Sequence, residues 1–335
     1  MLRNQTELEF ESSEFSPETQ GALTESAIAR LEAIAKLDRR LAWVVTVGPF
    51  LGVVAAITLL FFGYDVGPVE LGLLVGMYVL TMIGVEVGYH RYFTHSSFQT
   101  HRAIQIILAI FGAMAFQGPV IWWSATHRRH HNRSDQSGDP HSPNLHKEGL
   151  SGHLQGLLHS HMGWIFIAES TRPPGWAQYA HDLYRDKVLL KLHMSYFYWL
   201  LLGLAIPTVL GGVLNWTWKG ALLGFLWGGL VRIFLLNHFV WALNSICHVY
   251  GSRPFNTPHD LSRNNIWLAF PTFGQGWHNN HHAFPSSAVM GLEWWQIDIS
   301  GWVIRALEAV GLAWDVKVPT GHMIKARKKA LNTVN

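Results

Sequence analysis

Four long runs of hydrophobic residues divide the chain, and each is long enough to cross a lipid bilayer as a helix. They cover approximately residues 41–62, 69–88, 194–214 and 220–243. Two short links, 63–67 and 215–219, join the members of each pair, so each pair has room only for a helical hairpin. The pattern therefore predicts an all-α integral membrane protein with four transmembrane helices in two hairpins.

A fifth apolar run, 103–123, has the hydropathy of another span. If it crossed the bilayer, the histidines at 90–95 and those at 127–131 would lie on opposite faces, roughly 30 Å apart. One metal centre could not use both clusters. We therefore expect this segment to enter and return, or to lie partly embedded, with a break near Gln117, Gly118 and Pro119. The alternative is a fifth span with two unrelated histidine clusters.

The polar remainder surrounds one membrane domain, residues 29–318. Residues 1–28 are acidic and predict a disordered tail, residues 24–40 predict a helix ending at Arg39 and Arg40, and 319–335 form a basic tail. Residues 127–193 predict a water-exposed cap. Residues 248–335 are mixed and amphipathic, with Trp294, Trp295 and Trp302 suited to a membrane interface. Two hairpins place both termini, the cap and all three histidine clusters on one side, which the positive-inside rule assigns to the cytoplasm. Arg232 lies inside the fourth span, where a charge is costly, so we expect it to contact a buried polar partner.

Composition agrees with a membrane protein. Of 335 residues, 49% are hydrophobic and only 14% charged, whereas about 25% are charged in soluble domains. The basic residues flank the apolar runs and form no stripe interleaved with aromatic residues, so nucleic acid is not an expected partner. The single cysteine, Cys247, excludes an intramolecular disulfide and is expected to be a small buried residue.

Three histidine clusters carry the candidate chemistry. They comprise His90 and His95, then His127, His130 and His131, then His278, His281 and His282. Residues at i, i+3 and i+4 share one side of a helix, so the last two clusters, if helical, each direct three imidazoles the same way. A tetrahedral zinc takes four ligands at most, so eight nitrogens predict two metal ions.

Interpretations without a metal centre fit the clusters less well. A lone histidine in an apolar chain is more often a satisfied core or surface residue, but repetition of the HxxHH pattern is hard to explain by packing. A histidine-rich zinc-binding loop is normally contiguous and of low complexity. Imidazoles without thiolates suit zinc, copper, iron or nickel. Iron acting with O2 fits a nitrogen-rich site beside a membrane best, although the spacing cannot separate iron from copper.

The motifs HRYFTH, HRRHH and HNNHH together resemble the three histidine boxes of membrane-bound fatty acyl desaturases, and most of all the stearoyl-CoA or acyl-CoA delta-9 group. Four further stretches agree, and the similarity covers roughly residues 40–315. These stretches are GDPH at 138–141, HMGW at 161–164, NSICHVYGSRP at 244–254 and GWHNNHHAFP at 276–285.

The resemblance implies two irons bound by nine histidines, the eight above and His248, with Asn244 reaching one iron through water. His141 is expected in a turn or beside a ligand rather than as a ligand. Gln275 stands where the group often has glutamate, and its neutral amide keeps the hydrogen bonding but lacks the charge. Trp241, Trp122 and Trp123 are candidate walls of a substrate tunnel, although ordinary packing explains them equally well.

The activity implied is O2-dependent insertion of a cis double bond into a saturated fatty acyl chain, at the ninth carbon. The substrate would be a fatty acyl thioester, on CoA or acyl carrier protein, or an acyl lipid of the membrane. Because the chain has no cytochrome b5-type haem motif at either end, two electrons would come from a separate ferredoxin or cytochrome b5-like carrier and its reductase. Hydroxylation or another oxidation on the same scaffold stays open, and a non-enzymatic metal transporter or sensor is a more distant alternative.

Overall fold

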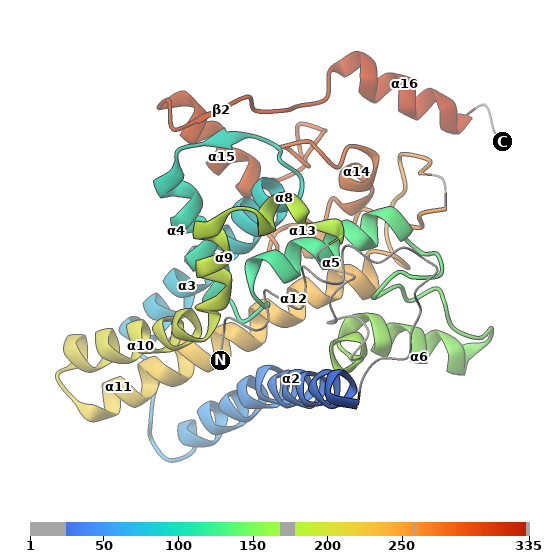
Figure 1. Cartoon of the computed structure of the whole chain (residues 1–335). Helices are drawn as coiled ribbons and strands as arrows, with labels where there is room; N and C mark the ends of the chain where they lie inside the picture. The colour runs from blue at the N-terminus through green and yellow to red at the C-terminus, as the bar shows by residue number, and fades with distance from the viewer. Residues whose placement is uncertain (1–24, 168–177, 258, 333–335) are drawn as a thin grey trace.

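The computed structural model describes residues 25–167, 178–257 and 259–332, and these are mostly helical (Figure 1). The membrane part contains α2 (Glu25–Leu60), α3 (Pro68–Ile83), η1 (Gly84–Thr94), α10 (Tyr196–Asn215), α11 (Trp218–Gly224), η4 (Phe225–Val231) and α12 (Arg232–Ile246). The remaining helices are α4 (Arg102–Ala113), α5 (Val120–Arg133), α6 (Leu150–His161), η2 (Gly163–Phe166), α8 (His181–Tyr184), α9 (Lys187–Met194), α13 (Ile266–Ala269), α14 (His278–Ala283), α15 (Ile299–Ala309) and α16 (Gly321–Asn332). Two short strands, β1 (Gln99–Thr100) and β2 (Ala313–Trp314), pair antiparallel with Gln99 opposite Trp314.

The four predicted spans are confirmed. Among the described residues, four helices are long and apolar enough to cross a membrane: Arg39–Leu60, Pro68–Thr94, Tyr196–Asn215 and Trp218–Ile246. The α10–α11 hairpin is packed so closely that a Cβ on Gly211 would lie 2.4 Å from the carbonyl oxygen of Gly220. Small residues at this contact let the two backbones touch, which is how membrane helices associate without a hydrophobic driving force.

The predicted entry helix is also present, but it does not end at Arg40. Instead α2 runs unbroken from Glu25 through the first span to Leu60. The predicted acidic tail otherwise lies outside the described residues.

The second span is longer than predicted. It continues from α3 into the π-helical η1, so His90 lies inside the helix and His95 directly follows it. The wider turn is visible where the His95 amide donates to the His90 carbonyl oxygen, five residues back, at 3.2 Å. π-helical turns are common at functional sites because the extra residue redirects side chains.

The fifth apolar run forms a helix that is too short to cross a membrane. Its helix α4 has 12 residues, about 18 Å at 1.5 Å per residue, which is too short to span. The chain then turns through Gly118, whose φ of +99° favours glycine, and α5 begins after Pro119. The helix is interrupted at the predicted position, between Ala113 and Val120, and this geometry favours the re-entrant or embedded segment over a fifth span.

Arg232 finds its polar partners in three backbone carbonyls. Its guanidinium donates to Gly228 (3.1 Å), Met114 (2.8 Å) and Gly203 (2.9 Å). The Gly203 carbonyl would normally accept from residue 207, but Pro207 has no N–H. Met114 follows the last residue of α4, where carbonyls also lack helical partners. Arg232 thus satisfies backbone groups that the apolar surroundings could not.

The cap lies at one end of the spans and is tied to them by a shared core. Val85, Tyr89 and Phe93 from the second span pack with Trp123 of α5 and Val240 of α12. Cys247 is buried, as predicted. The basic C-terminal segment is helical, and α16 packs against the cap beside α14 (Figure 1).

Candidate metal centre

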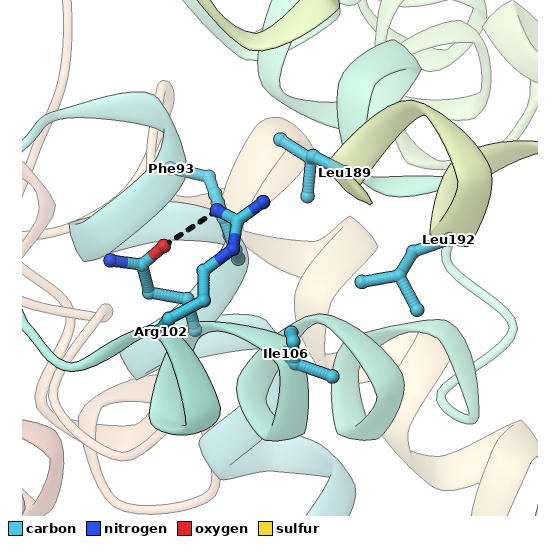
Figure 2. A pocket seen from close by; sticks show the side chains of 6 residues that line it. Phe93, Arg102, Ile106, Leu189 and Leu192 are labelled. Carbon is cyan, nitrogen blue, oxygen red and sulfur yellow. Dashed lines mark hydrogen bonds between the residues drawn. The ribbon is translucent and has the colours of Figure 1, made fainter. Parts of the chain in front are cut away.

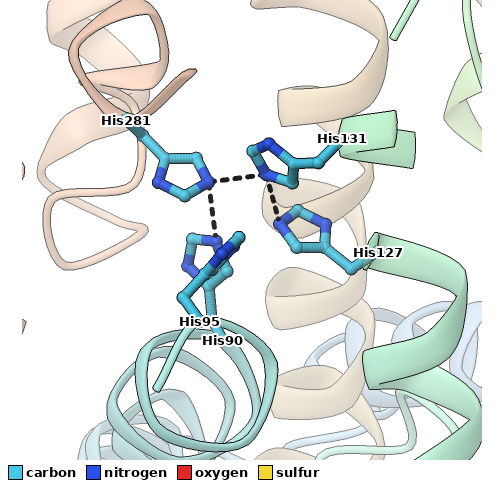
Figure 3. A group of neighbouring side chains, drawn as sticks. All are labelled: His90, His95, His127, His131 and His281. Carbon is cyan, nitrogen blue, oxygen red and sulfur yellow. Dashed lines mark hydrogen bonds between the residues drawn. The ribbon is translucent and has the colours of Figure 1, made fainter. Parts of the chain in front are cut away.

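Nine buried or half-buried histidines converge in two neighbouring groups where the spans meet the cap. Within each group the candidate ligand nitrogens all lie within 4.8 Å of one another. The larger group contains His90, His95, His127, His131 and His281, and the smaller contains His130, His248, His278 and His282. Figure 3 shows the imidazoles of the larger group turned toward one another from η1, α5 and α14. Every histidine that the sequence singled out for a metal lies in one of the two groups.

The structure corrects one expectation about these clusters. The two HxxHH segments are helical, in α5 and α14, but neither sends three imidazoles to one place. His127 and His131 join the larger group while His130 joins the smaller; His278 and His282 join the smaller while His281 joins the larger. Residues i and i+4 differ by only about 40° around a helix axis, whereas i+3 and i+4 differ by about 100°. Each helix therefore lies between the two groups and contributes to both.

The distances between imidazole nitrogens fit a bound cation. In the larger group the Nε2 atom of His281 lies 3.1 Å from Nε2 of His90 and 2.8 Å from Nε2 of His131. In the smaller group Nε2 of His278 lies 3.0 Å from Nε2 of His248 and 3.2 Å from Nε2 of His282. Nitrogens that bind one metal at about 2.1 Å in adjacent positions are separated by about 3 Å.

Carboxylates determine which nitrogen of the smaller group carries hydrogen. Asp139 accepts from Nδ1 of His130 at 3.0 Å, Asp135 from Nδ1 of His248 at 2.8 Å, and Asp260 from Nδ1 of His282 at 2.8 Å. Since an ionised carboxylate only accepts, each Nδ1 bears the proton and each Nε2 presents a lone pair. Three lone pairs turned toward one another repel unless a cation lies between them. Such carboxylate–histidine pairs are the usual support of metal-binding imidazoles.

Burial and neighbouring charges act differently on the individual groups. At His248 burial alone would lower the pKa, but the hydrogen bond and charge of Asp135 outweigh it and raise the pKa. Burial, reinforced by the neighbouring imidazoles, holds the pKa values of His278 and His281 well below the ordinary range, so both remain in the ligand form. For Asp260, burial alone would raise the pKa, but the interactions with His282 and His248 outweigh it and lower the pKa. The same balance lowers the pKa of Asp135, with His248 as its main partner.

The support of the larger group is different. Nδ1 of His90 lies 3.4 Å from a carboxylate oxygen of Glu86 and 3.2 Å from the amide nitrogen of Gln275. The amide oxygen of Gln275 is buried and has no hydrogen-bond partner among the described residues. Rotating the amide by half a turn would place that oxygen against the Nδ1–H of His90, which keeps a hydrogen bond there without adding charge.

The other residues singled out from the sequence border the groups. Asn244 is half-buried one helical turn before His248, and its water-mediated role stays a prediction. The ring of Trp123 stacks on His127 with centroids 5.1 Å apart, Trp122 stacks on Trp164 at 6.0 Å, and Trp241 is buried. His141 is buried beside His130, and its backbone N–H donates to Asp139 at 3.1 Å, which agrees with a turn beside a ligand.

Sequence reasoning missed Asp135 and Asp260, because isolated aspartates in loops follow no period.

Comparison with known proteins places this site in a family. A family model described as fatty acid desaturase matches residues 66–314. The chain is 51% identical over 284 residues to a hex-5-enoyl-[acyl-carrier protein] acetylenase from Moorena producens, covering 84% of this chain and 87% of that protein. It is 39% identical to delta-9 acyl-lipid desaturase 1 of Arabidopsis thaliana, covering 73% and 74% of the two chains. It is also 39% identical to a chloroplastic palmitoyl-monogalactosyldiacylglycerol delta-7 desaturase of the same plant, covering 73% and 61%.

This chain belongs to the fatty acid desaturase family. The resemblance carried by the histidine boxes is confirmed, including the likeness to delta-9 members. Members of the family are oxidoreductases, so the two histidine groups lie in an enzyme of lipid metabolism. A metal transporter or sensor is no longer a competing interpretation.

A small pocket near the desaturase centre does not account for the substrate. It lies between η1, α4 and α9, where Arg102 donates to the Gln105 amide oxygen at 2.9 Å (Figure 2). Its lining is formed by Phe93, Arg102, Gln105, Ile106, Leu189 and Leu192. Its empty volume, with open solvent included, is only about 150 Å³. A long acyl chain needs more room, and the tunnel expected beside Trp122, Trp123 and Trp241 stays a prediction.

Replacing Asp135 with asparagine should weaken metal binding by about 10- to 100-fold. Besides His248, Asp135 accepts from Ser142, Asn144 and the backbone N–H of Leu261, so asparagine keeps the shape but removes the charge that fixes the His248 tautomer. Metal retained during titration with a chelator measures the effect. Asp182→Asn is the matched control, because Asp182 is exposed and paired with Arg128. Equal metal retention in the two variants would contradict this role.

Proposed function

We propose that this protein is a membrane di-iron fatty acyl desaturase that inserts a cis double bond into a saturated acyl chain. The convergence of five and four imidazoles in two adjacent groups is the observation that carries this proposal. Family membership supports it, because the fatty acid desaturase family is generally iron-dependent. Imidazole-rich sites without thiolates suit iron.

The nine histidines are proposed as the iron ligands, with Asn244 completing the smaller group through water. Bound iron would supply O2 reduction and the removal of hydrogen from unactivated methylene groups, which no protein side chain can deprotonate. The saturated chain, O2, two electrons and two protons would yield the unsaturated chain and two waters. Burial holds His278 and His281 neutral, and buried side chains such as Trp123, stacked on His127, keep bulk water from the centre.

The ninth carbon is the proposed position of attack, and the delta-9 relatives support it. Other relatives are named for the fifth or seventh carbon, and one is an acetylenase acting on an acyl carrier protein substrate. We infer an acyl thioester or acyl lipid as substrate, because the names of the relatives include both. An acetylenic product is a second candidate, favoured by the 51% identity to that acetylenase.

The cap and both termini are proposed to face the cytoplasm. The two links at the opposite ends of the spans contain one basic residue, Lys219, whereas arginines flank the cap ends of the spans. The positive-inside rule supports this orientation. A ferredoxin or cytochrome b5-like carrier with its reductase would then reach the centre from the cytoplasm.

Fatty-acid profiling of a desaturase-deficient host that expresses the protein tests the proposal. New cis monounsaturated chains with a double bond at carbon nine, absent in the His278→Ala variant, are the expected result. Hydroxylated or acetylenic chains would agree with an oxidative metal centre but would show that the proposed desaturation is not the reaction. If iron analysis of the purified protein also found no metal, the di-iron assignment would be wrong.

A further inference from the structure

A basic helix covers the outer side of the third histidine cluster. Ile324 of α16 packs with Phe255, Ala283 and Phe284, and Phe284 lies two residues after the candidate ligand His282. The sequence of α16, GHMIKARKKALN, contains four Lys or Arg residues and no Asp or Glu. The basic helix α16 therefore lies against the protein layer that encloses the two histidine groups.

Two of these basic side chains lie over aromatic rings. The Arg327 guanidinium is 4.7 Å from the centroid of Phe284, and the Lys328 ammonium is 5.9 Å from that of Phe255. The two rings are themselves in edge contact, with centroids 5.4 Å apart. The backbone N–H of Phe284 donates to the His281 carbonyl at 3.0 Å. One aromatic residue thus connects an exposed cation with a candidate iron ligand.

The surface around α16 has the composition of a protein-binding site. Lys325 and Arg327 are exposed, and Lys328 pairs with Glu293. The next residue after Glu293 is Trp294, which is 96% exposed. Tryptophan and arginine are enriched among the residues that contribute most to protein interfaces. In Figure 1, α16 lies on the side of the cap away from α2 and α11, which places it away from the lipid-facing helices.

We propose that α16 and Trp294 form the docking surface for an acidic one-electron carrier protein with an iron–sulfur cluster or haem. This inference rests on the proposed function, which consumes two electrons in each turnover. Each docked carrier would be oxidised by one electron, so two carriers dock in succession. Charge complementarity favours an acidic protein and speeds its association. The Arg327–Phe284–His281 contacts place the docked carrier next to the centre.

Binding of an acidic [2Fe–2S] ferredoxin to the purified full-length enzyme in neutral-lipid nanodiscs tests this surface. We expect the double variant Lys325→Glu/Arg327→Glu to raise Kd at least tenfold at low ionic strength. Wild-type binding should weaken between roughly 0.05 and 0.5 M salt, because screening acts on exposed charges. Arg185→Glu/Lys187→Glu is the matched control, with two exposed basic residues beside α9, and should change Kd less than twofold. Lys325→Glu alone, which leaves the Arg327–Phe284 contact intact, should give an intermediate Kd.

A chemical reductant separates docking from the reaction. With dithionite as donor, iron content and turnover of the double variant should match those of the wild type, whereas turnover driven by ferredoxin should fall. A double variant that binds ferredoxin as tightly as the wild type would overturn the docking surface. Loss of binding to anionic-lipid vesicles, with ferredoxin binding unchanged, would overturn it too and assign α16 to lipid headgroups. Failure of the wild type to desaturate with dithionite would instead count against the proposed function, since carrier binding is measured without turnover.

Discussion

His130→Ala should reduce desaturation more than about 100-fold while the protein stays inserted in the membrane. His130 is the one member of the HRRHH segment in the smaller group, so its loss leaves three imidazoles there and leaves Asp139 without its buried partner. Loss of a residue that only supports a ligand typically costs 10- to 100-fold, and loss of a ligand should cost more. Product formation and iron per protein, measured on the same membrane preparation, give the result.

His153→Ala is the control for this prediction. His153 is exposed on α6 and belongs to neither histidine group, so its removal should leave turnover and iron content within about twofold. Retained turnover in His130→Ala would remove His130 from the ligand set.

Asp298→Ala should destabilise the fold by about 3–5 kcal/mol, because it leaves the buried Arg91 guanidinium without its charged partner and with only the Ala288 carbonyl as acceptor. Arg91 and Asp298 are both buried and are joined by two hydrogen bonds of 2.6 and 3.1 Å. Asp298 also accepts from the backbone N–H groups of Met290 and Gly301. This carboxylate therefore joins η1, which carries His90, to the start of α15. Thermal unfolding in detergent, followed by circular dichroism, measures the loss.

Glu308→Ala provides the comparison. Glu308 forms an ion pair with Arg305 at 2.6 Å, but both side chains are more than a third exposed. Water screens such a pair, and its removal should cost less than about 1 kcal/mol. If Asp298→Ala and Glu308→Ala unfolded at the same temperature, the buried Arg91–Asp298 pair would stabilise the fold no more than the exposed pair does, and the prediction would be wrong.

The two histidine groups differ in the charge of their supporting side chains, which bears on how each would hold a metal ion. Three aspartates support the smaller group, whereas Glu86 and the neutral Gln275 support the larger through His90. A carboxylate raises the basicity of the imidazole that it contacts. The smaller group therefore has stronger donors and fewer of them, and the larger group has more imidazoles with less support.

Much of the architecture was predictable from the sequence because its signals are local. A run of about 20 apolar residues is read from composition, and a two-hairpin arrangement follows from the short links. The break at Gln117–Pro119 was predictable from Gly and Pro together with the demand that two histidine clusters meet. The extension of the second span through η1 was not, since hydropathy falls at His90 and Arg91 while the helix continues around them.

The repeated HxxHH spacing was enough to predict that these histidines converge and to predict two metal ions, because packing alone seldom produces such a repeat. His248 was reached only through the family resemblance. The division of the nine histidines into two groups was visible only in the folded chain, because side chains at i+3 and i+4 can contact different groups when a helix lies between two sites. It alone also placed Asp135 and Asp260, which arrive from loops distant in sequence. Such contacts depend on where loops cross in space, and no periodicity along the chain records that.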